Sequence, residues 1–304
     1  MRTLRGILLP TTTPFEINGK CTLDAFGTNL RAWAKTGISG FVLLGSTGER
    51  VHLDEREYAE VIESARREVS SELAFIAGAG QQSTLGTINE IKKAADAGAD
   101  AVLVITPSFY RSAITQETLI THYNTIADGS PVPVILYSMP ALTGIKIEPI
   151  TIARLSDHPN IVGVKDSSAD VEGFRQTVDL CPNGFDVMTG NGTIFLDALR
   201  AGATGAILAV GCAVPEMCVE IMRAFKEGDD ERADHLQSKL TPLATAVTTK
   251  YGIGGLKAAL DMNGYVGGSV RAPLQIASES AKAEIRQLLE DAKASFKELV
   301  ADYR

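Results

Sequence analysis

Short apolar runs recur along the first two thirds of the chain, and this rhythm constrains the fold more than any other feature of the sequence. Each run is too short for an ordinary helix, and several are rich in Val and Ile, which favour strands. Because the runs are continuous rather than alternating with polar residues, they predict strands that are buried on both faces. The eight runs are Gly6–Leu9, Gly40–Leu44, Leu73–Ala77, Ala101–Ile105, Val134–Tyr137, Ile161–Val164, Phe185–Met188 and Gly205–Val210.

Helical patterns separate these runs. Asp24 stands where an N-cap is expected, Asp54 and Glu57 form a capping-box-like pair, and Gly98 follows the third pattern as a C-terminal glycine. Strands that alternate with helices in this way predict β/α units and a parallel sheet. The expected helices are Asp24–Lys35, Asp54–Val69, Ser83–Ala97, Gln116–Ala127, Glu148–Leu155, Asp170–Leu180 and Thr193–Ala201.

Eight β/α units predict an α/β fold of the (β/α)8 TIM-barrel type, which typically needs about 250 residues. The chain has 304 residues, so a barrel leaves room for an addition. A doubly wound open sheet is the alternative, and it usually carries a Gly-rich phosphate loop directly after the first strand. Here the first run continues into Pro10-Thr11-Thr12-Thr13-Pro14-Phe15, which contains no glycine, and the pattern therefore favours the barrel.

From Pro215 onward the pattern is mostly helical, and these residues exceed the one helix that closes a barrel. No linker rich in Pro, Gly or Ser precedes them. We therefore expect a barrel over residues 1–214 and packed C-terminal helices over residues 215–304, in a single structural unit. The expected helices of this extension are Glu216–Lys226, Asp230–Thr249, Leu256–Asn263 and Ser278–Tyr303.

Composition excludes several classes of protein. Hydrophobic residues make up 45% and charged residues 22% of the chain, which excludes a disordered protein. A formal net charge of −8 without a basic run argues against a nucleic-acid partner. No apolar run approaches the roughly 18 residues of a membrane span. Four scattered cysteines and the absence of CxxC or HExxH spacings indicate free thiols, no metal site and a cytoplasmic protein.

The active site of a barrel lies at the carboxyl ends of its strands, and Lys165 stands there, directly after Ile161–Val164. Burial disfavours the ammonium form of a lysine, and a neutral amine can attack a ketone to form a Schiff base. The protonated imine is then an electron sink for the neighbouring carbon. The alternative for Lys165 is an ion pair, for example with Asp166.

Hydroxyl groups follow other strands at the same end of the expected barrel. Tyr137 ends the fifth run, where its phenol could move protons at an imine; the alternative is a core tyrosine with a satisfied hydroxyl. The turn Gly45-Ser46-Thr47-Gly48 offers two hydroxyls and backbone N–H groups that suit a carboxylate. The alternative for this turn is an ordinary connection between a strand and a helix.

Taken together, these motifs resemble the pyruvate-dependent class I aldolase superfamily that contains dihydrodipicolinate synthase and N-acetylneuraminate lyase. The resemblance covers essentially the whole chain. The motifs that carry it are Thr12-Thr13-Pro14-Phe15, Gly45-Ser46-Thr47-Gly48-Glu49, Thr106-Pro107, Tyr137-Ser138-Met139-Pro140-Ala141-Leu142-Thr143-Gly144 and Gly163-Val164-Lys165-Asp166-Ser167-Ser168.

The resemblance implies a role for each matching residue. Lys165 would form the imine with pyruvate, Tyr137 and Ser46 would relay protons, and Thr47 would hold the pyruvate carboxylate. Family members are usually homotetramers, built as dimers of dimers, in which a tyrosine from a neighbouring subunit completes the relay. Here Phe109 stands at that position with Tyr110 beside it, so either Tyr110 substitutes for the relay tyrosine or that member of the relay is absent. The other implied substrate positions are Gly45, Phe109, Leu142, Ser167, Gly190, Asn191, Thr193 and Leu208.

Two departures bear on the substrate. Dihydrodipicolinate synthases carry an arginine that clamps a carboxylate where this chain has Leu142, which counts against that activity. N-acetylneuraminate lyases use an acidic pair where this chain has Gly190-Asn191-Gly192-Thr193, although Asn191 and Thr193 suit a shorter polyol. The closest likeness is to 4-hydroxy-2-oxoglutarate aldolases and to fungal aldolases for 2-keto-3-deoxy sugar acids, through Leu136-Tyr137-Ser138, Tyr251-Gly252-Ile253, Gly255-Leu256-Lys257 and Arg271-Ala272-Pro273-Leu274-Gln275.

The resemblance therefore implies a class I lyase that acts on 4-hydroxy-2-oxoglutarate or a 2-keto-3-deoxy sugar acid such as 2-keto-3-deoxy-L-galactonate. It needs no metal or organic cofactor, because the lysine imine supplies the electron sink. The alternatives are dihydrodipicolinate synthase, N-acetylneuraminate lyase, a keto-deoxy-acid dehydratase and a non-catalytic sensor of 2-oxo acids. Residues given no chemical role are His122, His158 and His235, expected on helix or loop surfaces, and Lys250, Lys257 and Arg271, candidates for a contact between subunits.

Overall fold

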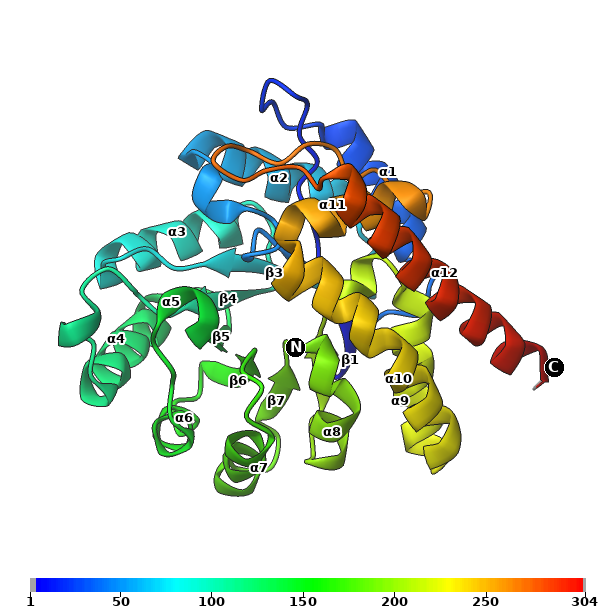
Figure 1. Cartoon of the computed structure of the whole chain (residues 1–304). Coiled ribbons are helices and arrows are strands. Elements are labelled where there is room, and N and C mark those ends of the chain that lie inside the picture. Colours follow the sequence, from blue (N-terminus) through cyan, green and yellow to red (C-terminus); the bar gives the residue numbers. More distant parts are fainter. Residues whose placement is uncertain (1–3, 303–304) are drawn as a thin grey trace.

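Eight parallel strands close into a barrel in the computed structural model, which describes residues 4–302 (Figure 1). Each strand pairs with its neighbour in chain order, and β8 returns to pair with β1. The predicted (β/α)8 architecture is confirmed. The strands are β1 (Gly6–Pro10), β2 (Gly40–Leu43), β3 (Ala74–Ala79), β4 (Ala101–Ile105), β5 (Val134–Ser138), β6 (Ile161–Asp166), β7 (Asp186–Thr189) and β8 (Gly205–Ile207).

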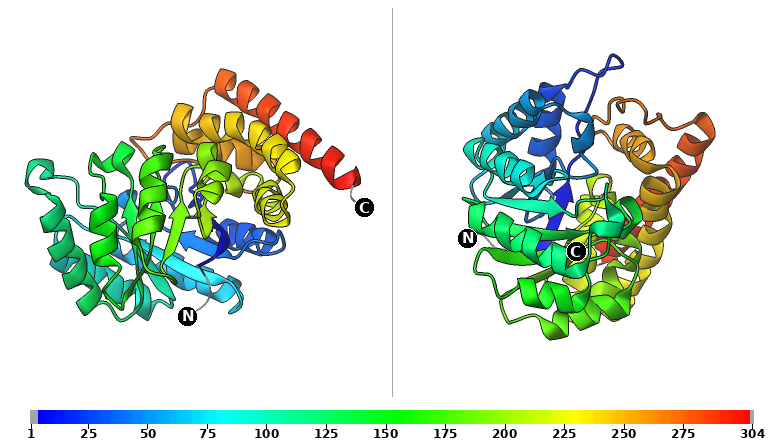
Figure 2. Two further views of the ribbon diagram at one scale, coloured as in Figure 1. Left: turned by 90° about the horizontal axis from the view of Figure 1, so that it is seen from below. Right: turned by 90° about the vertical axis from the view of Figure 1, so that its left-hand side faces the viewer.

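Helices cover the outside of the barrel (Figure 2). The capping box of Asp54 and Glu57 is confirmed, and the Ser83 hydroxyl accepts a hydrogen bond from the Gly86 N–H at the start of the next helix. The expected cap at Asp24 is wrong, because Thr22 occupies the N-cap position and Asp24 lies inside the first turn. The helices around the strands are α1 (Leu23–Trp33), α2 (Glu55–Glu68), α3 (Thr84–Asp96), α4 (Gln116–Gly129), α5 (Pro140–Thr143), α6 (Pro149–Leu155), α7 (Val171–Leu180) and α8 (Phe195–Arg200).

Four further α-helices form the C-terminal part: α9 (Pro215–Glu227), α10 (Asp230–Thr245), α11 (Gly252–Met262) and α12 (Glu279–Asp302). Helix α9 contacts α8 and β1 and so closes the ring around the barrel, while α10 and α11 both contact α12. Figures 1 and 2 show α12, in red, running past the side of the barrel. Tyr303, where the last expected helix ends, lies outside the described residues.

The buried side chains form two principal layers. Residues such as Leu8, Val42, Leu103 and Met188 fill the barrel interior. The larger cluster lies between the strands and the helices, and it includes Leu240 of the C-terminal part. This arrangement follows from the continuous apolar runs, since successive residues of a strand point to opposite faces and both faces here are covered.

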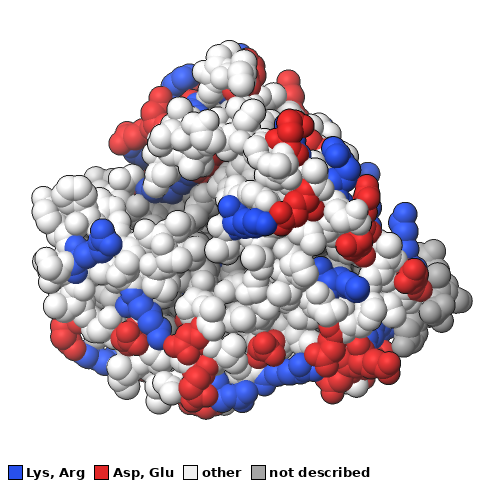
Figure 3. Space-filling view, viewed as in Figure 1, with Lys and Arg blue, Asp and Glu red and all other residues white. Residues whose placement is uncertain are grey.

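Charged side chains are dispersed on the face seen in Figure 3, where Lys and Arg alternate with Asp and Glu and form no single basic patch. One histidine departs from expectation. His122 on α4 is 6% exposed rather than on the surface, and its Nδ1 lies 2.9 Å from the Thr84 hydroxyl. None of the helices within residues 4–302 combines the length and the apolar character that a membrane crossing requires.

Candidate active site

Lys165 and Tyr137 meet at the carboxyl ends of β6 and β5. The two residues are register partners on adjacent strands, so their side chains leave the barrel wall side by side. The Lys165 Nζ lies 4.3 Å from the centroid of the Tyr137 ring. Both side chains are buried, with 5% and 4% of their surfaces exposed. The two strands therefore hold an amine and a phenol against one another in a space from which water is largely excluded.

The alternative pairing of Lys165 with Asp166 is not found among the described residues. Neighbours on a strand point to opposite faces, and the Asp166 carboxylate instead accepts a hydrogen bond of 2.6 Å from the Ser168 N–H. Burial raises the pKa of Asp166, against the opposing effect of that hydrogen bond. Lys165 is thus left facing Tyr137 rather than a carboxylate.

Ser46, in the turn that follows β2, lies beside the Lys165–Tyr137 pair. Its hydroxyl lies 3.3 Å from the Tyr137 hydroxyl, across 91 positions of sequence. Burial opposes ionisation of the phenol, but the Lys165 charge and hydrogen bonds with Ser46, Lys165 and Ser167 outweigh it and hold the pKa of Tyr137 below its ordinary value. A phenol in this setting gives up its proton more readily than a free tyrosine.

Gly190, directly after β7, leaves the room that the Lys165 side chain occupies. A Cβ at this position would lie 2.0 Å from the Ser167 hydroxyl and 2.5 Å from Lys165 Cε. The Gly190 N–H donates a 2.6 Å hydrogen bond to the Asp166 carbonyl, which fixes the backbone close to the lysine. The close approach therefore requires glycine.

The turn that carries Ser46 and Thr47 has an unusual backbone. It is bounded by Leu44 and Glu49, two non-glycine residues with positive φ angles of 53° and 56°. Such residues persist only where the surrounding structure holds them, and they concentrate at functional sites. Thr47 is 7% exposed, and the Gly48 carbonyl accepts a 2.8 Å hydrogen bond from the Thr13 hydroxyl.

A cavity of about 290 Å³ opens at the carboxyl ends of β2 to β5. Ser46 and Tyr137 lie on its wall, whereas Lys165 is not among its lining residues and lies against the Tyr137 ring. Leu142 also lines the cavity and is 63% exposed, so it stands at the rim. Predicted site residues on the wall are Gly45, Ser46, Tyr137 and Leu142; residues not predicted include Arg50, Val51 and Gln82.

Phe109 and Tyr110 lie outside this cavity. They are 75% and 71% exposed and pack edge to face, with their ring centroids 5.0 Å apart. Among the described residues of this single chain, neither forms a hydrogen bond or a ring contact with Tyr137, whose hydroxyl lies beside that of Ser46. The substitution of Tyr110 for a relay tyrosine therefore stays a prediction.

The predicted substrate-binding residues Asn191 and Thr193, after β7, are hydrogen-bonded within the chain, and Leu208, after β8, is buried. Asn191 Oδ1 accepts hydrogen bonds of 3.0 and 2.8 Å from the Thr193 N–H and hydroxyl, and Asn191 Nδ2 donates to the Ser168 carbonyl. Leu208 is fully buried in the cluster between strands and helices, whereas its neighbour Ile207 faces the barrel interior. Roles for Asn191, Thr193 and Leu208 in binding substrate stay predictions.

The four cysteines are free, as expected: Cys21 and Cys181 are half-buried, and Cys212 and Cys218 are buried. Burial raises the pKa of Cys218 to about 12, so this thiol stays protonated. Within residues 4–302, the His, Cys, Asp and Glu side chains form no group of three that could hold a metal ion.

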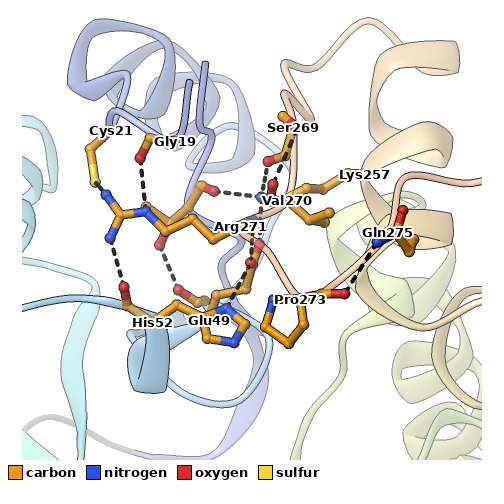
Figure 4. A network of polar contacts seen from close by, with 12 residues as sticks. Gly19, Cys21, Glu49, His52, Lys257, Ser269, Val270, Arg271, Pro273 and Gln275 are labelled. Carbon is orange, nitrogen blue, oxygen red and sulfur yellow. Dashed lines mark hydrogen bonds and ion pairs between the residues drawn. The ribbon is translucent and has the colours of Figure 1, made fainter. Parts of the chain in front are cut away.

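A buried charge network behind the turn was missed by sequence reasoning (Figure 4). The Glu49 carboxylate lies 2.6 Å from the Lys257 ammonium, and both side chains are almost completely buried. Lys257 Nζ also donates to the carbonyls of Thr13 and Ser269. Burial lowers the pKa of Lys257, while Glu49 acts in the opposite sense. Lys257 of α11 thereby holds the residue that follows the Ser46–Thr47 turn.

Arg271 completes this network from the segment before α12. Its backbone N–H donates to Glu49, and its guanidinium pairs with Glu57 of α2 and donates to the His52 carbonyl. Lys257 and Arg271 are therefore engaged within one chain, and a contact of either residue with another subunit stays a prediction. The available signal was Lys257 itself, a single charge within the apolar sequence Gly254–Leu260.

Known proteins share both the sequence and the shape of this chain. The Dihydrodipicolinate synthetase family matches residues 3–292. A 4-hydroxy-tetrahydrodipicolinate synthase from Thermodesulfovibrio yellowstonii is 36% identical over 288 residues, which cover 95% of this chain and 98% of that protein.

Solved structures of proteins from the same family have the same fold as this chain. The 4-hydroxy-tetrahydrodipicolinate synthase of Methylacidiphilum fumariolicum SolV superposes with a TM-score of 0.93 at 27% identity, covering 98% of this chain and 99% of the other. A prophage protein of the dihydrodipicolinic acid synthase family from E. coli K12, solved in complex with pyruvate, gives a TM-score of 0.89 at 28% identity, covering 95% and 99%. These relatives have the same barrel fold as this chain. The chain therefore belongs to the dihydrodipicolinate synthetase family and is a carbon–carbon lyase of the pyruvate-dependent aldolase type.

Proposed function

We propose that Lys165 forms a Schiff base with the 2-oxo group of pyruvate, or of a longer 2-oxo acid, and that the enzyme makes or breaks the carbon–carbon bond to an aldehyde. The observation that carries this proposal is the buried contact between the Lys165 amine and the Tyr137 ring, with Ser46 beside the phenol. An amine, a proton donor and a hydroxyl acceptor are the groups that imine chemistry requires.

In the cleavage direction, the neutral Lys165 amine attacks C2 of the 2-oxo acid. Tyr137 protonates the departing hydroxyl of the carbinolamine, and water leaves as the imine forms. The protonated imine then accepts the electron pair of the C3–C4 bond, while the proton of the C4 hydroxyl passes to Tyr137 or to a substrate carboxylate. The aldehyde leaves, the enamine is protonated at C3, and water hydrolyses the imine to release pyruvate. None of these steps needs a metal or an organic cofactor, because the lysine imine supplies the electron sink.

Ser46 and Thr47 act at the two ends of the pyruvyl group in this proposal. Ser46, 3.3 Å from the phenol, exchanges the proton that Tyr137 carries. Thr47 holds the pyruvate carboxylate with its hydroxyl and the N–H groups of the turn. The strained residues at each side of the turn, Leu44 and Glu49, support a role in positioning rather than in connection alone.

As the substrate of the cleavage reaction we propose 4-hydroxy-2-oxoglutarate or a 2-keto-3-deoxy sugar acid such as 2-keto-3-deoxy-L-galactonate. The support is Leu142, which lines the cavity where a synthase of this family would carry an arginine. Without that guanidinium the rim has no bidentate clamp at this place. The segments shared with the aldolases of these substrates point the same way.

Dihydrodipicolinate synthase is the second candidate. The support for it is the name of the curated relatives, 4-hydroxy-tetrahydrodipicolinate synthase, at 31–36% identity. Condensation of pyruvate with aspartate semialdehyde would use the same Lys165 imine. N-acetylneuraminate lyase, a keto-deoxy-acid dehydratase and a non-catalytic sensor remain as outcomes of the assay below.

We further propose a cytoplasmic homotetramer, built as a dimer of dimers. The exposed aromatic pair of Phe109 and Tyr110 supports an association between subunits, because large apolar side chains that project together commonly mark an interface. Sedimentation of the purified protein measures the assembly directly.

The experiment that tests the activity is pyruvate release, coupled to lactate dehydrogenase, from a panel of 2-oxo acids. The panel contains 4-hydroxy-2-oxoglutarate, keto-deoxy hexonates, keto-deoxy pentonates and N-acetylneuraminate, and Lys165→Ala is the control. Release from one substrate, lost in the control, identifies the aldolase. Silence across the panel contradicts the cleavage proposal and directs the test to aspartate semialdehyde, then to dehydration. Absence of a borohydride-trapped pyruvate adduct would indicate the sensor.

A further inference from the structure

Arg50 brings a positive charge to the wall of the substrate cavity. It begins the short 3₁₀-helix Arg50–His52 that follows the Ser46–Thr47 turn, and its side chain is 10% exposed. Among the described residues that line the cavity, Arg50 is the single charged one, and no carboxylate is present. A buried guanidinium without an acid on the same wall favours an anionic ligand.

The Glu90 carboxylate on α3 binds one nitrogen of the Arg50 guanidinium, Nη2. Both Glu90 oxygens accept from Arg50 Nη2, and they also accept from the Gly80 N–H at 2.8 Å and from Gln81 Nε2 at 2.9 Å. Glu90 is thus fully engaged on its own side. Arg50 Nε is buried and has no hydrogen-bond partner among residues 4–302. The guanidinium is therefore fixed in place while part of its donor capacity is unused.

Gln82 adds a second oriented donor to the same wall. Its Oε1 accepts hydrogen bonds from the N–H groups of Ser108 and Phe109, at 2.9 and 2.8 Å. Two backbone donors require the oxygen at that place, which fixes which end of the amide is Nε2. Gln82, Ser108 and Arg50 all line the cavity. The cavity that Tyr137 lines thus also presents N–H and O–H donors from Arg50, Gln82 and Ser108.

We propose that Arg50 and Gln82 bind the carboxylate of the aldehyde partner, so that the enzyme acts on aldehyde acids rather than neutral sugars. This inference rests on the proposed Schiff-base function. Cleavage of 4-hydroxy-2-oxoglutarate releases glyoxylate, and aspartate semialdehyde likewise carries a carboxylate. Cleavage of a 2-keto-3-deoxy sugar acid releases a neutral hydroxyaldehyde, which cannot use the charge of Arg50. Arg50 thereby selects between the candidate substrates.

The test compares condensation of pyruvate with two aldehydes of equal size, glyoxylate and the neutral glycolaldehyde, and with aspartate semialdehyde as a longer acid. Products are measured by mass spectrometry, because lactate dehydrogenase also reduces glyoxylate. Arg50→Gln should lower kcat/KM for the preferred acid by about 10- to 100-fold, the loss typical of a charge-assisted hydrogen bond, and leave glycolaldehyde unchanged. The matched control is Arg56→Gln, which removes an exposed arginine paired with Glu60 on α2.

Arg50→Lys guards against a folding defect, since it keeps a cation for Glu90 but lacks the spare guanidinium donors, and it should show the same selective loss. Equal losses of kcat/KM for the acid and for glycolaldehyde would mean that Arg50 only supports the structure, and would overturn the inference. A wild-type enzyme that makes no product from either acid would overturn it too. Borohydride trapping with pyruvate separates the two levels: an adduct equal in wild type and Arg50→Gln keeps the Schiff-base function, and no wild-type adduct refutes both.

Discussion

The Tyr137 ring covers the Lys165 amine at 4.3 Å, and the two residues are held opposite one another by the pairing of β5 with β6. Neither side chain can turn away without leaving a buried position. The relationship places an amine and a phenol on two paired strands rather than on loops. Such placement fixes reacting groups more tightly than a loop can.

Borohydride reduction in the presence of pyruvate should label Lys165 alone. Lys257 is the matched comparison, because it is equally buried but is paired with Glu49 and donates to two carbonyls. Peptide mapping by mass spectrometry identifies the modified lysine. Lys165→Ala should abolish the adduct, while Lys250→Ala, at an exposed ion pair, should retain it. A label on Lys257 would contradict the assignment.

Tyr137→Phe should lower kcat by about 10²- to 10⁴-fold, because the proton donor at the carbinolamine is lost. The wild-type rate should also fall on the alkaline side. The phenol must be protonated to donate, and its pKa lies below the ordinary value of about 10, so the fall begins below that pH. A pH profile of kcat for both proteins is the measurement. The same alkaline limb in Tyr137→Phe would assign it to another group.

Gly190→Ala should impair imine formation by about 100-fold, because the added methyl group would lie 2.5 Å from Lys165 Cε and must displace it. Gly184→Ala is the control, with no atom within 4 Å of the new methyl group but a φ of +98°. That variant should lose about 1 kcal/mol of stability and keep its activity. Single-turnover trapping and thermal unfolding give the two readouts, and similar activities would refute the steric argument.

Lys257→Met should cost about 3–5 kcal/mol of stability, since it leaves the Glu49 carboxylate buried without its cation. The double variant Glu49→Gln/Lys257→Met should recover part of that loss, because the uncompensated charge is gone. Urea unfolding of the single and double variants forms the measurement. Lys250→Met, at an exposed pair with Glu284, serves as the control and should change stability little. Equal losses at Lys250 and Lys257 would contradict a special role for the buried pair.

His122 should make the protein less stable in mild acid. Burial lowers the pKa of His122 from 6.5 to about 4, so between these values the unfolded chain binds a proton that the folded chain does not. Stability is therefore lost as the pH falls from about 6.5, by about 3 kcal/mol at pH 4, and by little more below that pH. Unfolding of wild type and His122→Asn at pH 7 and pH 5 isolates the effect. A pH dependence that is identical in both proteins would rule it out.

The barrel was predictable because its signal is repeated. Apolar runs mark buried strands locally, and eight of them in alternation with helices leave few arrangements. Their carboxyl ends then indicated Lys165 and Tyr137, because a parallel barrel brings these ends together whatever the loops do. Strand ends were less predictable: Val210 continues the apolar run of β8 but lies in a 3₁₀-helix, since apolar character alone does not distinguish the two.

The wall of the site was less visible in the sequence. Arg50 and Gln82 come from different loops, and only the closed structure brings them to one cavity. Lys257 and Arg271 were considered as candidates for a contact between subunits, and a buried network within the chain was not foreseen, because charged residues are rarely buried. Their partners, Glu49 and Glu57, lie more than 200 positions away, and no local pattern connects them.

The connection of Glu49 to Lys257 and Arg271 also sets an order for biosynthesis. All eight strands have been translated once residue 207 is made, yet Glu49, which follows the turn bearing Ser46 and Thr47, still lacks the Lys257 ammonium and the Arg271 backbone N–H that hold its carboxylate. Both of these residues are translated after the last strand. The strands of the barrel therefore precede in the chain the residues that anchor the Ser46–Thr47 turn, so this turn depends on a part of the polypeptide that lies beyond the barrel.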